Sequence, residues 1–308
     1  MTQRLVRGDL DRAVGAIQTG GLVAMPTETV YGLAADATNP AALARVFAAK
    51  ARPSDHPLIV HLADPDDLAE WAPEASPTAR LLAATAWPGP LTLIVPRSSR
   101  LPSDVAGGRS TVGLRVPAHP IARALIREAG VPLAAPSANR FGAVSPTTIE
   151  HVRLDLGDVL DPGLDVLLDG GPCPVGVEST IVDTTVDPVQ ILRAGAVTHT
   201  QVRSIIAAEV APARGPARAS GMLLSHYAPA CDVRVVDTAD DAVALRAGSP
   251  GSRVLDLTHD VGKYARDLYA ELRRADADGI RTLIAVLPEP DGLGHAVRDR
   301  LTKAAAPR

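Results

Sequence analysis

Apolar positions in the first two hundred residues alternate between helical spacing and short continuous runs. Residues 9–20 predict a helix, with Asp9 as N-cap and a glycine pair at its end. A second helix is expected from Asn39 to about Lys50, because Pro40 would take the first helical position, where its missing N–H costs nothing. Further helical patterns cover residues 64–71, 76–86 and 119–129. Strand-like runs occupy residues 22–25, 58–62, 91–95, 111–116, 131–135, 166–168, 180–184 and 189–192.

This alternation of strands and helices indicates an α/β fold class. The connection between the runs near residues 182 and 190 is too short for a parallel crossover, so we expect a mixed sheet with flanking helices. Residues 211–220 lack periodicity and are rich in Pro, Gly and Ala, as in a linker. Beyond them, strands are expected at 233–236, 254–257 and 282–286, and helices at 238–247 and 261–274.

The chain therefore divides into three predicted parts. Residues 1–210 form the larger domain, residues 211–230 a linker, and residues 231–308 a smaller α/β domain with a Rossmann-like arrangement. The apolar fraction of 46% supports a sizeable core and excludes a disordered chain. With 31 Lys and Arg against 35 Asp and Glu, the net charge of −4 argues against a protein that mainly binds nucleic-acid backbones.

Other features narrow the class further. Aromatic residues make up only 3% of the chain, too few for a base-stacking platform. Two cysteines, Cys173 and Cys231, cannot form a disulfide framework, a CxxC pair or a cysteine-based zinc site. The sequence begins without the apolar core of a secretory signal, and no run approaches the roughly 18 apolar residues of a membrane helix. We therefore expect a soluble cytoplasmic protein with no membrane partner.

Polar residues gather at the ends of the apolar runs, where α/β proteins place their ligand sites. Lys50 and Arg52 lie two residues apart in a proline-limited loop after a helix and can grip a polyphosphate from two sides. Strand alternation places Thr111 and Arg115 on one face. Five clusters stand out, at residues 26–33, 50–61, 111–117, 136–147 and 176–183, the last followed by Arg193.

Each cluster also has a purely structural interpretation. Thr27, Glu28 and Thr29 could cap a turn, and Ser137 and Asn139 could satisfy local backbone groups. Lys50 and Arg52 could form a solvated helix end. Arg115 could be a strand-edge cation, and His61 a packed core histidine. Recurrence at strand ends within one domain favours a common site. Because the sequence contains no Walker loop, GxGxxG fingerprint, HExxH or GxSxG motif, phosphates would be held by scattered cations, hydroxyls and backbone amides.

At these residues the sequence resembles the threonylcarbamoyl-AMP synthase family, in its longer two-domain branch. The resemblance is carried by Pro26–Leu33, Lys50-x-Arg52, Pro57–Leu62, Trp87–Thr92, Arg115-x-Pro117, Ser137-x-Asn139, Gly176–Asp183 and Leu192–Gly195. His226–Pro229 and the tail from Gly292 to Lys303 match the longer branch. It implies a YrdC-like twisted mixed sheet and the condensation of L-threonine, bicarbonate and ATP to threonylcarbamoyl-AMP and pyrophosphate.

The resemblance also implies roles for individual residues. Lys50 and Arg52 would be the catalytic cations, with no nucleophilic side chain and no resident metal, and Mg²⁺ would arrive with ATP. His226 and Tyr227, on the linker, would close over a water-labile intermediate. Threonine would be held by Thr29, His61, Arg115, Ser137 and Ser179. ATP would be surrounded by Lys50, Arg52, His56, Thr111, Asn139, Ser145, Arg193 and Tyr227.

The product would feed N6-threonylcarbamoylation of adenosine 37 in tRNA, which implies a downstream transferase machinery as partner. The sequence departs from the family pattern at three places. His56 stands where Asn is common, Ser220 and the Leu223-Leu224 pair alter the linker, and residues 231–308 make a short second domain.

Two other functions compete with this one. A double-stranded RNA or tRNA-binding module would use a local cluster of Arg52, Arg115, Arg140 and Arg193. A carbamoyltransferase of the hydrogenase-maturation type would need acylphosphatase and zinc-finger modules, for which this sequence has neither the cysteines nor the N-terminal length. The net charge disfavours the first, and the missing modules disfavour the second.

Overall fold

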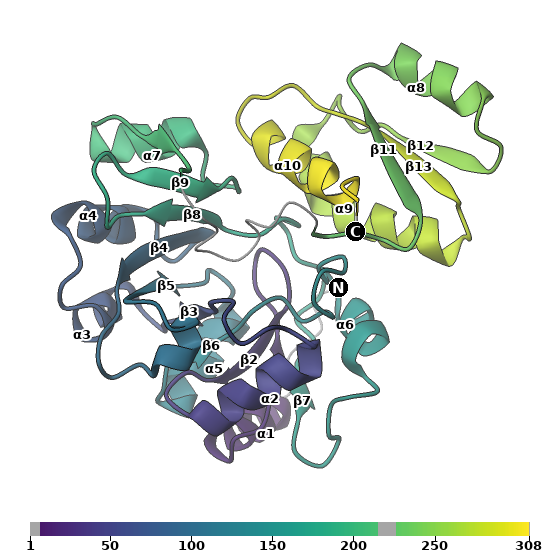
Figure 1. The fold of residues 1–308 in the computed structure, drawn as a ribbon. Helices are drawn as coiled ribbons and strands as arrows, with labels where there is room; N and C mark the ends of the chain where they lie inside the picture. Colours follow the sequence, from purple (N-terminus) through teal and green to yellow (C-terminus); the bar gives the residue numbers. More distant parts are fainter. Residues whose placement is uncertain (1–6, 215–225, 308) are drawn as a thin grey trace.

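The computed structural model describes residues 7–214 and 226–307. These residues form a large unit around a mixed sheet and a smaller unit around a parallel sheet (Figure 1). Ser220 and the Leu223-Leu224 pair of the predicted linker lie outside the described residues. None of the helices in the described part of the chain is long and apolar enough to cross a membrane.

Ten strands of the described chain form the large sheet, in the order β10-β9-β8-β4-β5-β3-β6-β2-β1-β7. Neighbours β3 and β5 are parallel, whereas β8 and β9 are antiparallel, which confirms the predicted mixed sheet. The strands are β1 (Val23–Met25), β2 (Gly32–Asp36), β3 (Ile59–His61), β4 (Leu91–Pro96), β5 (Thr111–Arg115), β6 (Leu133–Ala134), β7 (Val166–Leu167), β8 (Thr180–Asp183), β9 (Gln190–Arg193) and β10 (Ala211–Pro212).

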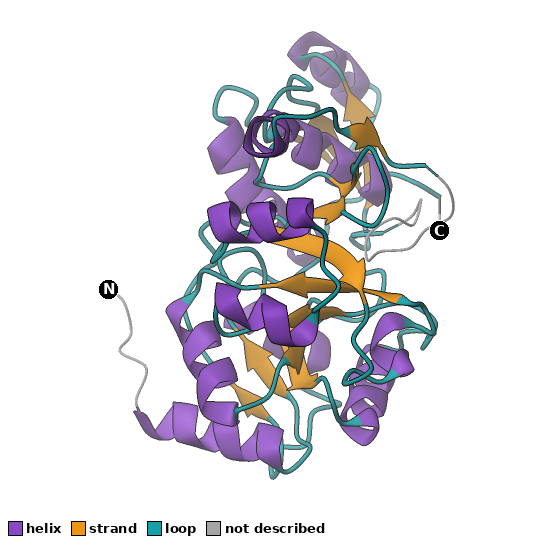
Figure 2. Cartoon of the chain, turned by 90° about the vertical axis from the view of Figure 1, so that its left-hand side faces the viewer, coloured by secondary structure: helices purple, strands orange, loops and turns teal. Residues whose placement is uncertain are grey.

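Helices cover both faces of this sheet (Figure 2), because its strands alternate apolar residues between two cores. In β1, Ala24 belongs to the core shared with α2 and α4, whereas Val23 and Met25 belong to the core shared with α1 and α5. The helices of this unit are α1 (Arg7–Gln18), α2 (Pro40–Lys50), α3 (Leu68–Trp71), α4 (Pro77–Ala86), α5 (Pro120–Ala129), α6 (Ile149–Leu156) and α7 (His199–Ile206), with 3₁₀ turns at Pro65–Asp67 and Ser103–Ala106.

Local signals in the sequence explain where these elements begin. The Asn39 side chain accepts hydrogen bonds from the amides of Ala41 and Ala42, and Pro40 starts α2 as predicted. The predicted helix at 64–71 is instead a 3₁₀ turn followed by the four-residue α3. The predicted strand at 131–135 shortens to β6, because Pro132 has no N–H to donate to a ladder.

The predictions missed β2, α6, α7, β10 and a last helix, α10 (Gly294–Ala304). The β2 segment, Gly-Leu-Ala-Ala-Asp, lacks the β-branched residues that mark strands, and its pairing with β1 and β6 makes it a strand. Ala211–Pro212, predicted as the start of the linker, instead form β10 and pair in parallel with β9. The large sheet therefore extends beyond residue 210.

The smaller unit contains the three predicted strands and the two predicted helices, and α10 in addition. It contains β11 (Asp232–Val236), α8 (Ala239–Ala247), β12 (Ser252–Leu255), α9 (Val261–Ala277), β13 (Thr282–Val286) and α10. Its three strands are parallel in the order β11-β13-β12. Helices α9 and α10 lie between this sheet and the large unit (Figure 1).

The two units share one apolar core. Val30, Val144 and Val177 of the large unit belong to the same buried cluster as residues of α9 and α10. Gly176, with φ +81°, lies so close to α9 that a Cβ there would stand 2.3 Å from the Arg266 Cα atom. The smaller unit is therefore packed tightly against the segment that precedes β8.

Candidate active site

A pocket lies where strand ends of the large unit meet the segment that begins at His226. Eight of the thirteen residues predicted for the site line it: Thr29, Arg52, His61, Arg115, Ser137, Ser179, Arg193 and Tyr227. The other lining residues are Val30, Ile59, Ala135, Pro136, Glu178 and His226. Eight residues from the clusters at strand ends therefore lie around one pocket.

The loop between β1 and β2 is shaped by its own hydroxyls. Thr27 Oγ1 donates to the Val30 carbonyl at 2.6 Å and accepts hydrogen bonds from the amides of Thr29 and Val30. This tight turn directs the Thr29 hydroxyl to Arg115, whose Nη1 donates to it at 3.0 Å. Thr27 is thus a turn residue, whereas Thr29 belongs to the pocket.

Arg115 and His61 are neighbours because β3 and β5 pair in parallel with these two residues in register. Both side chains are buried. The Arg115 guanidinium forms an ion pair with Glu28 at 2.5 Å, and the other Glu28 oxygen accepts from the Ala118 amide. Burial, reinforced by Arg115, lowers the pKa of His61 to about 3, so its imidazole is neutral at physiological pH.

Ser179 is fixed by a second cation. Arg193 donates from Nε to the Ser179 carbonyl and from Nη2 to its hydroxyl, both at 3.0 Å. The same hydroxyl lies 2.7 Å from the Thr92 hydroxyl. Register explains the meeting of these groups, because β8 pairs with both β4 and β9.

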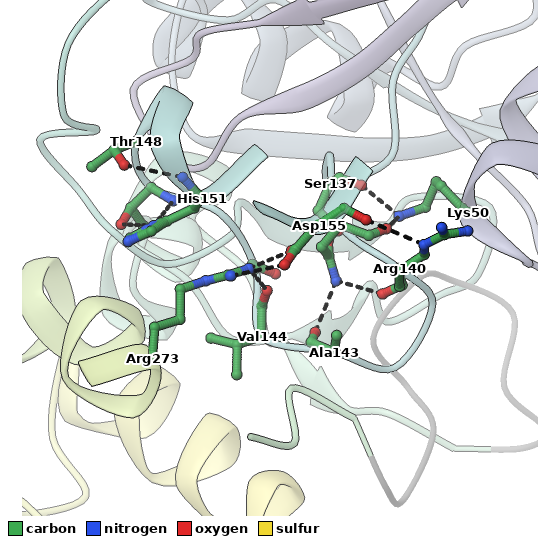
Figure 3. A network of polar contacts seen from close by, with 12 residues as sticks. Lys50, Ser137, Arg140, Ala143, Val144, Thr148, His151, Asp155 and Arg273 are labelled. Carbon is green, nitrogen blue, oxygen red and sulfur yellow. Dashed lines mark hydrogen bonds and ion pairs between the residues drawn. The ribbon is translucent and has the colours of Figure 1, made fainter. Parts of the chain in front are cut away.

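Lys50 and Arg52 differ in their surroundings. Lys50 ends α2 and is buried, and its Nζ donates to the carbonyls of Ser137, at 2.5 Å, and Asn139 (Figure 3). Burial, and then the nearby Arg52, lower its pKa well below the usual value. The solvated-helix-end interpretation is therefore wrong for Lys50, which anchors the Ser137–Asn139 loop from behind the pocket.

Arg52 faces the pocket. Ala51, with φ +51°, turns the chain after α2, and Arg52 Nη2 donates to the Pro57 carbonyl at 3.0 Å. Its guanidinium carbon lies 5.3 Å from the centre of the Phe141 ring. Burial lowers the pKa of Arg52 to about 10, which leaves it cationic at neutral pH.

The remaining predicted residues do not line the pocket. Ser145 and Asn139 are buried behind it: Ser145 Oγ donates to Glu178 at 2.6 Å, and Asn139 Nδ2 donates to the carbonyls of Arg140 and Ala143. His56 lies 5.1 Å, centre to centre, from the Phe141 ring. Thr111 starts β5, at the end of the strand opposite Arg115.

His226 and Tyr227 close one side of the pocket. Their rings lie 4.2 Å apart, and Tyr227 has a positive φ of 62°, which turns the chain sharply at this point. Burial lowers the pKa of His226 to about 3 and raises that of Tyr227 to about 12. Both side chains are thus neutral at physiological pH.

Sequence reasoning missed the role of Glu178, although its cluster had been singled out. Glu178 lines the pocket and accepts hydrogen bonds from Ser145, Tyr269 and Arg300. Burial alone would raise its pKa, but Arg300, Arg193 and the Ser145 hydroxyl lower it to about 2. Tyr269 and Arg300 come from α9 and α10, and no spacing in the sequence links them to residue 178.

The described residues contain no group of three or more His, Cys, Asp or Glu side chains placed to hold a metal ion. Glu178 is the carboxylate of the pocket lining, and both its oxygens accept protein hydrogen bonds. The lining thus combines buried cations, neutral imidazoles and hydroxyls. Such a set can bind an anionic ligand next to a small polar one.

The two buried histidines predict acid-sensitive stability. The unfolded chain binds their protons near pH 6.5, whereas the folded chain binds them only near pH 3. Stability therefore falls as the pH drops below 6.5, by about 2 kcal/mol for each histidine at pH 5. We expect the melting temperature to fall between pH 7 and pH 5, and less steeply in His61→Gln; equal slopes for the two proteins would contradict this.

Comparisons with known proteins cover both units of the chain. A family model described as "Telomere recombination" matches residues 15–195, and one described as "Threonylcarbamoyl-AMP synthase, C-terminal domain" matches residues 197–306. A threonylcarbamoyl-AMP synthase of Pyrococcus abyssi is 38% identical and spans 99% of this chain and 96% of its own. One of Bacillus subtilis is 36% identical and spans 96% of this chain and 93% of its own.

A solved structure shows the same overall arrangement. P. abyssi Sua5 complexed with L-threonine superposes with a TM-score of 0.90, at 37% identity, over 98% of this chain and 96% of its own. The large unit alone resembles Escherichia coli YciO, with a TM-score of 0.53 at 24% identity over 63% of this chain and 92% of that one, a likeness of fold.

Proposed function

The chain belongs to the threonylcarbamoyl-AMP synthase family, and we propose that it condenses L-threonine, bicarbonate and ATP to threonylcarbamoyl-AMP and pyrophosphate. The observation that carries this proposal is the single pocket that gathers all five residues assigned to threonine with Arg52, Arg193 and Tyr227. A relative that shares this fold has been solved with L-threonine bound.

The pocket offers different chemistry to the two larger substrates. Thr29, Ser137 and neutral His61 supply hydrogen bonds suited to the polar groups of threonine. Arg52 and Arg193 supply positive charge for the phosphates of ATP. Because the folded protein keeps His61 neutral down to about pH 3, this side chain is too weak a base to take the threonine ammonium proton at neutral pH. We therefore assign His61 to orientation rather than to proton transfer.

The reaction needs no nucleophilic side chain. The free amine of threonine attacks the bicarbonate carbon, and loss of water gives the carbamate. A carbamate oxygen then attacks the α-phosphorus of ATP and displaces pyrophosphate. Positioning and charge neutralisation by Arg52 supply most of the rate in such phosphate chemistry. His226 and Tyr227, both buried against the pocket, exclude the water that would destroy the intermediate.

Mg²⁺ fits this site as a companion of the nucleotide rather than as a resident ion. The described residues present no carboxylate cage, and Mg²⁺ commonly binds through substrate phosphates and waters. The ion would supply charge neutralisation on the triphosphate. We further propose that the product passes to a tRNA threonylcarbamoyl transferase, and that the protein acts in the cytoplasm.

The structure disfavours the RNA-binding alternative. Three of the four arginines suggested for a basic surface, Arg52, Arg115 and Arg193, are buried around the pocket. The fourth, Arg140, forms an ion pair with Asp158. These side chains therefore do not combine into an exposed basic patch of the kind that binds a phosphate backbone.

Pyrophosphate release tests the proposed function directly. The full-length protein is incubated with ATP and Mg²⁺, and threonine and bicarbonate are omitted one at a time. We expect release only when both are present. Release that ignores either co-substrate, or no release under any condition, would contradict the synthase assignment, and a gel shift with a steep salt dependence would then favour RNA binding.

A further inference from the structure

We propose that Arg300, on the last helix of the smaller unit, is a positioning residue for the reaction: it holds Glu178 in place and thereby fixes the wall of the pocket that carries Ser179. This inference rests on the proposed function and deepens it. It makes the smaller unit part of the catalytic arrangement, because a residue 122 positions along the chain completes the pocket wall.

The contacts of Arg300 support this role. Its side chain has no solvent exposure, and its Nε donates to Glu178 Oε2 at 2.8 Å. Its Nη1 donates to Asp299 at 2.8 Å, which fixes the orientation of the guanidinium. Tyr269 on α9 donates to the same Glu178 oxygen at 2.8 Å. Two helices of the smaller unit therefore each donate a hydrogen bond to the same carboxylate of the large unit.

Burying a carboxylate without a partner costs folding free energy, so the position of Glu178 depends on the groups that pair with it. Glu178 is buried, and Arg300 is the cation that contacts it directly. If the guanidinium were removed, Arg193 and the hydroxyls of Ser145 and Tyr269 would still stabilise the carboxylate, but the loss of the Arg300 ion pair would favour protonation or movement of the segment toward water. Either change would reach the pocket, because Glu178 itself lines it.

A displacement of Glu178 would also move the next residue, Ser179. Ser179 follows Glu178 in the chain, and its hydroxyl contacts both Thr92 and Arg193. The segment has little room to shift, because a Cβ on Gly195 would lie 2.6 Å from the Glu178 carbonyl and 2.4 Å from the Thr180 amide nitrogen. Movement of Glu178 would therefore disturb the Ser179 hydroxyl.

Arg300 also contacts a second residue of the pocket lining, Tyr227. Its guanidinium carbon lies 5.3 Å from the centre of the Tyr227 ring, and the Tyr269 ring lies 5.6 Å from that of Tyr227. One side chain thus contacts both Glu178, which precedes β8 in the large unit, and Tyr227, which lies just before the smaller unit.

A second ion pair between the units provides the matched control. Arg273 on α9 contacts Asp155 on α6 at 2.5 Å (Figure 3), and neither residue lines the pocket. Replacement of Asp155 by Asn weakens the docking of the units without changing the partners of Glu178. The effect of a looser interface can therefore be separated from the effect of a displaced pocket wall.

The experiment compares Arg300→Met, Glu178→Gln, the double variant and Asp155→Asn in the full-length protein. Threonine- and bicarbonate-dependent pyrophosphate release gives kcat and KM, and calorimetry gives L-threonine affinity. We expect Arg300→Met to lower kcat/KM by about 100-fold and to weaken threonine binding. Asp155→Asn should stay close to wild type in both, and the double variant should be no worse than Glu178→Gln alone.

Other outcomes of this experiment would contradict the proposal. Additive losses in the double variant, or an Asp155→Asn variant as impaired as Arg300→Met, would overturn the proposal and leave Arg300 a general interface residue. If Arg300→Met does not fold, Arg300→Lys replaces it, because it keeps the charge but loses the planar fork, and wild-type kinetics in that variant would overturn the proposal. A wild-type protein without threonine-dependent release would instead reject the proposed function itself.

Discussion

Replacement of Arg52 by Gln should lower kcat for pyrophosphate release by about 100- to 1000-fold, the loss typical for one preorganised charge-stabilising group. Arg52 lines the pocket and stays cationic despite its burial, since its pKa is about 10. Negative charge on the transferring phosphate must be neutralised by groups already in place, and Gln supplies a hydrogen bond without charge. Release of pyrophosphate under saturating threonine, bicarbonate and ATP measures the loss.

Two further variants make the result specific. Arg52→Lys keeps the positive charge but loses the planar guanidinium with its paired N–H donors, so we expect activity between that of wild type and that of Arg52→Gln. Arg127→Gln makes the same change at a half-exposed arginine that pairs with Asp64 away from the pocket, and it should leave turnover unchanged. Near-normal turnover in Arg52→Gln would mean that Arg52 is not the phosphate cation.

The sequence predicts those features of the fold that are determined by residues close together in the chain. Asn39 and Pro40 mark the start of α2, and the short connection between β8 and β9 requires an antiparallel pair. The missed strand β2 shows the limit of such signals, because its Gly-Leu-Ala-Ala segment becomes a strand through pairing with β1 and β6. Strand formation there is set by tertiary contacts rather than by propensity.

The site residues also divide into those that local sequence signals predict and those that only tertiary packing brings together. Thr29, His61 and Arg115 could be predicted to meet because each lies at the end of an apolar run, where ligand sites of α/β folds gather. Glu178 and Arg300 could not, because the packing of α9 and α10 on the large unit brings them together. A sequence interpreted as two domains and a linker gives no sign that the second domain reaches the pocket of the first.

Replacement of Lys50 by Met should reduce both stability and turnover, because Lys50 is a structural anchor within the site. The substitution removes the Lys50 donor from the buried Asn139 carbonyl and one of two donors from the Ser137 carbonyl, which also accepts from the Asn139 amide, at a cost of about 2 kcal/mol. Ser137 lines the pocket, so release of its loop should weaken threonine binding and lower pyrophosphate release by about 100-fold. Thermal unfolding, threonine calorimetry and the pyrophosphate assay measure the three effects.

The pattern of losses decides what Lys50 does. Lys263→Met, at a half-exposed lysine that pairs with Asp267, is the matched control and should change none of the three measurements. If Lys50→Met lost turnover but bound threonine as wild type does, Lys50 would act on the phosphates alone. To do so, its ammonium would have to leave the two carbonyls when ATP binds. A variant with lowered melting temperature and full turnover would remove Lys50 from the catalytic residues, and the phosphate charge would then fall to Arg52 and Arg193.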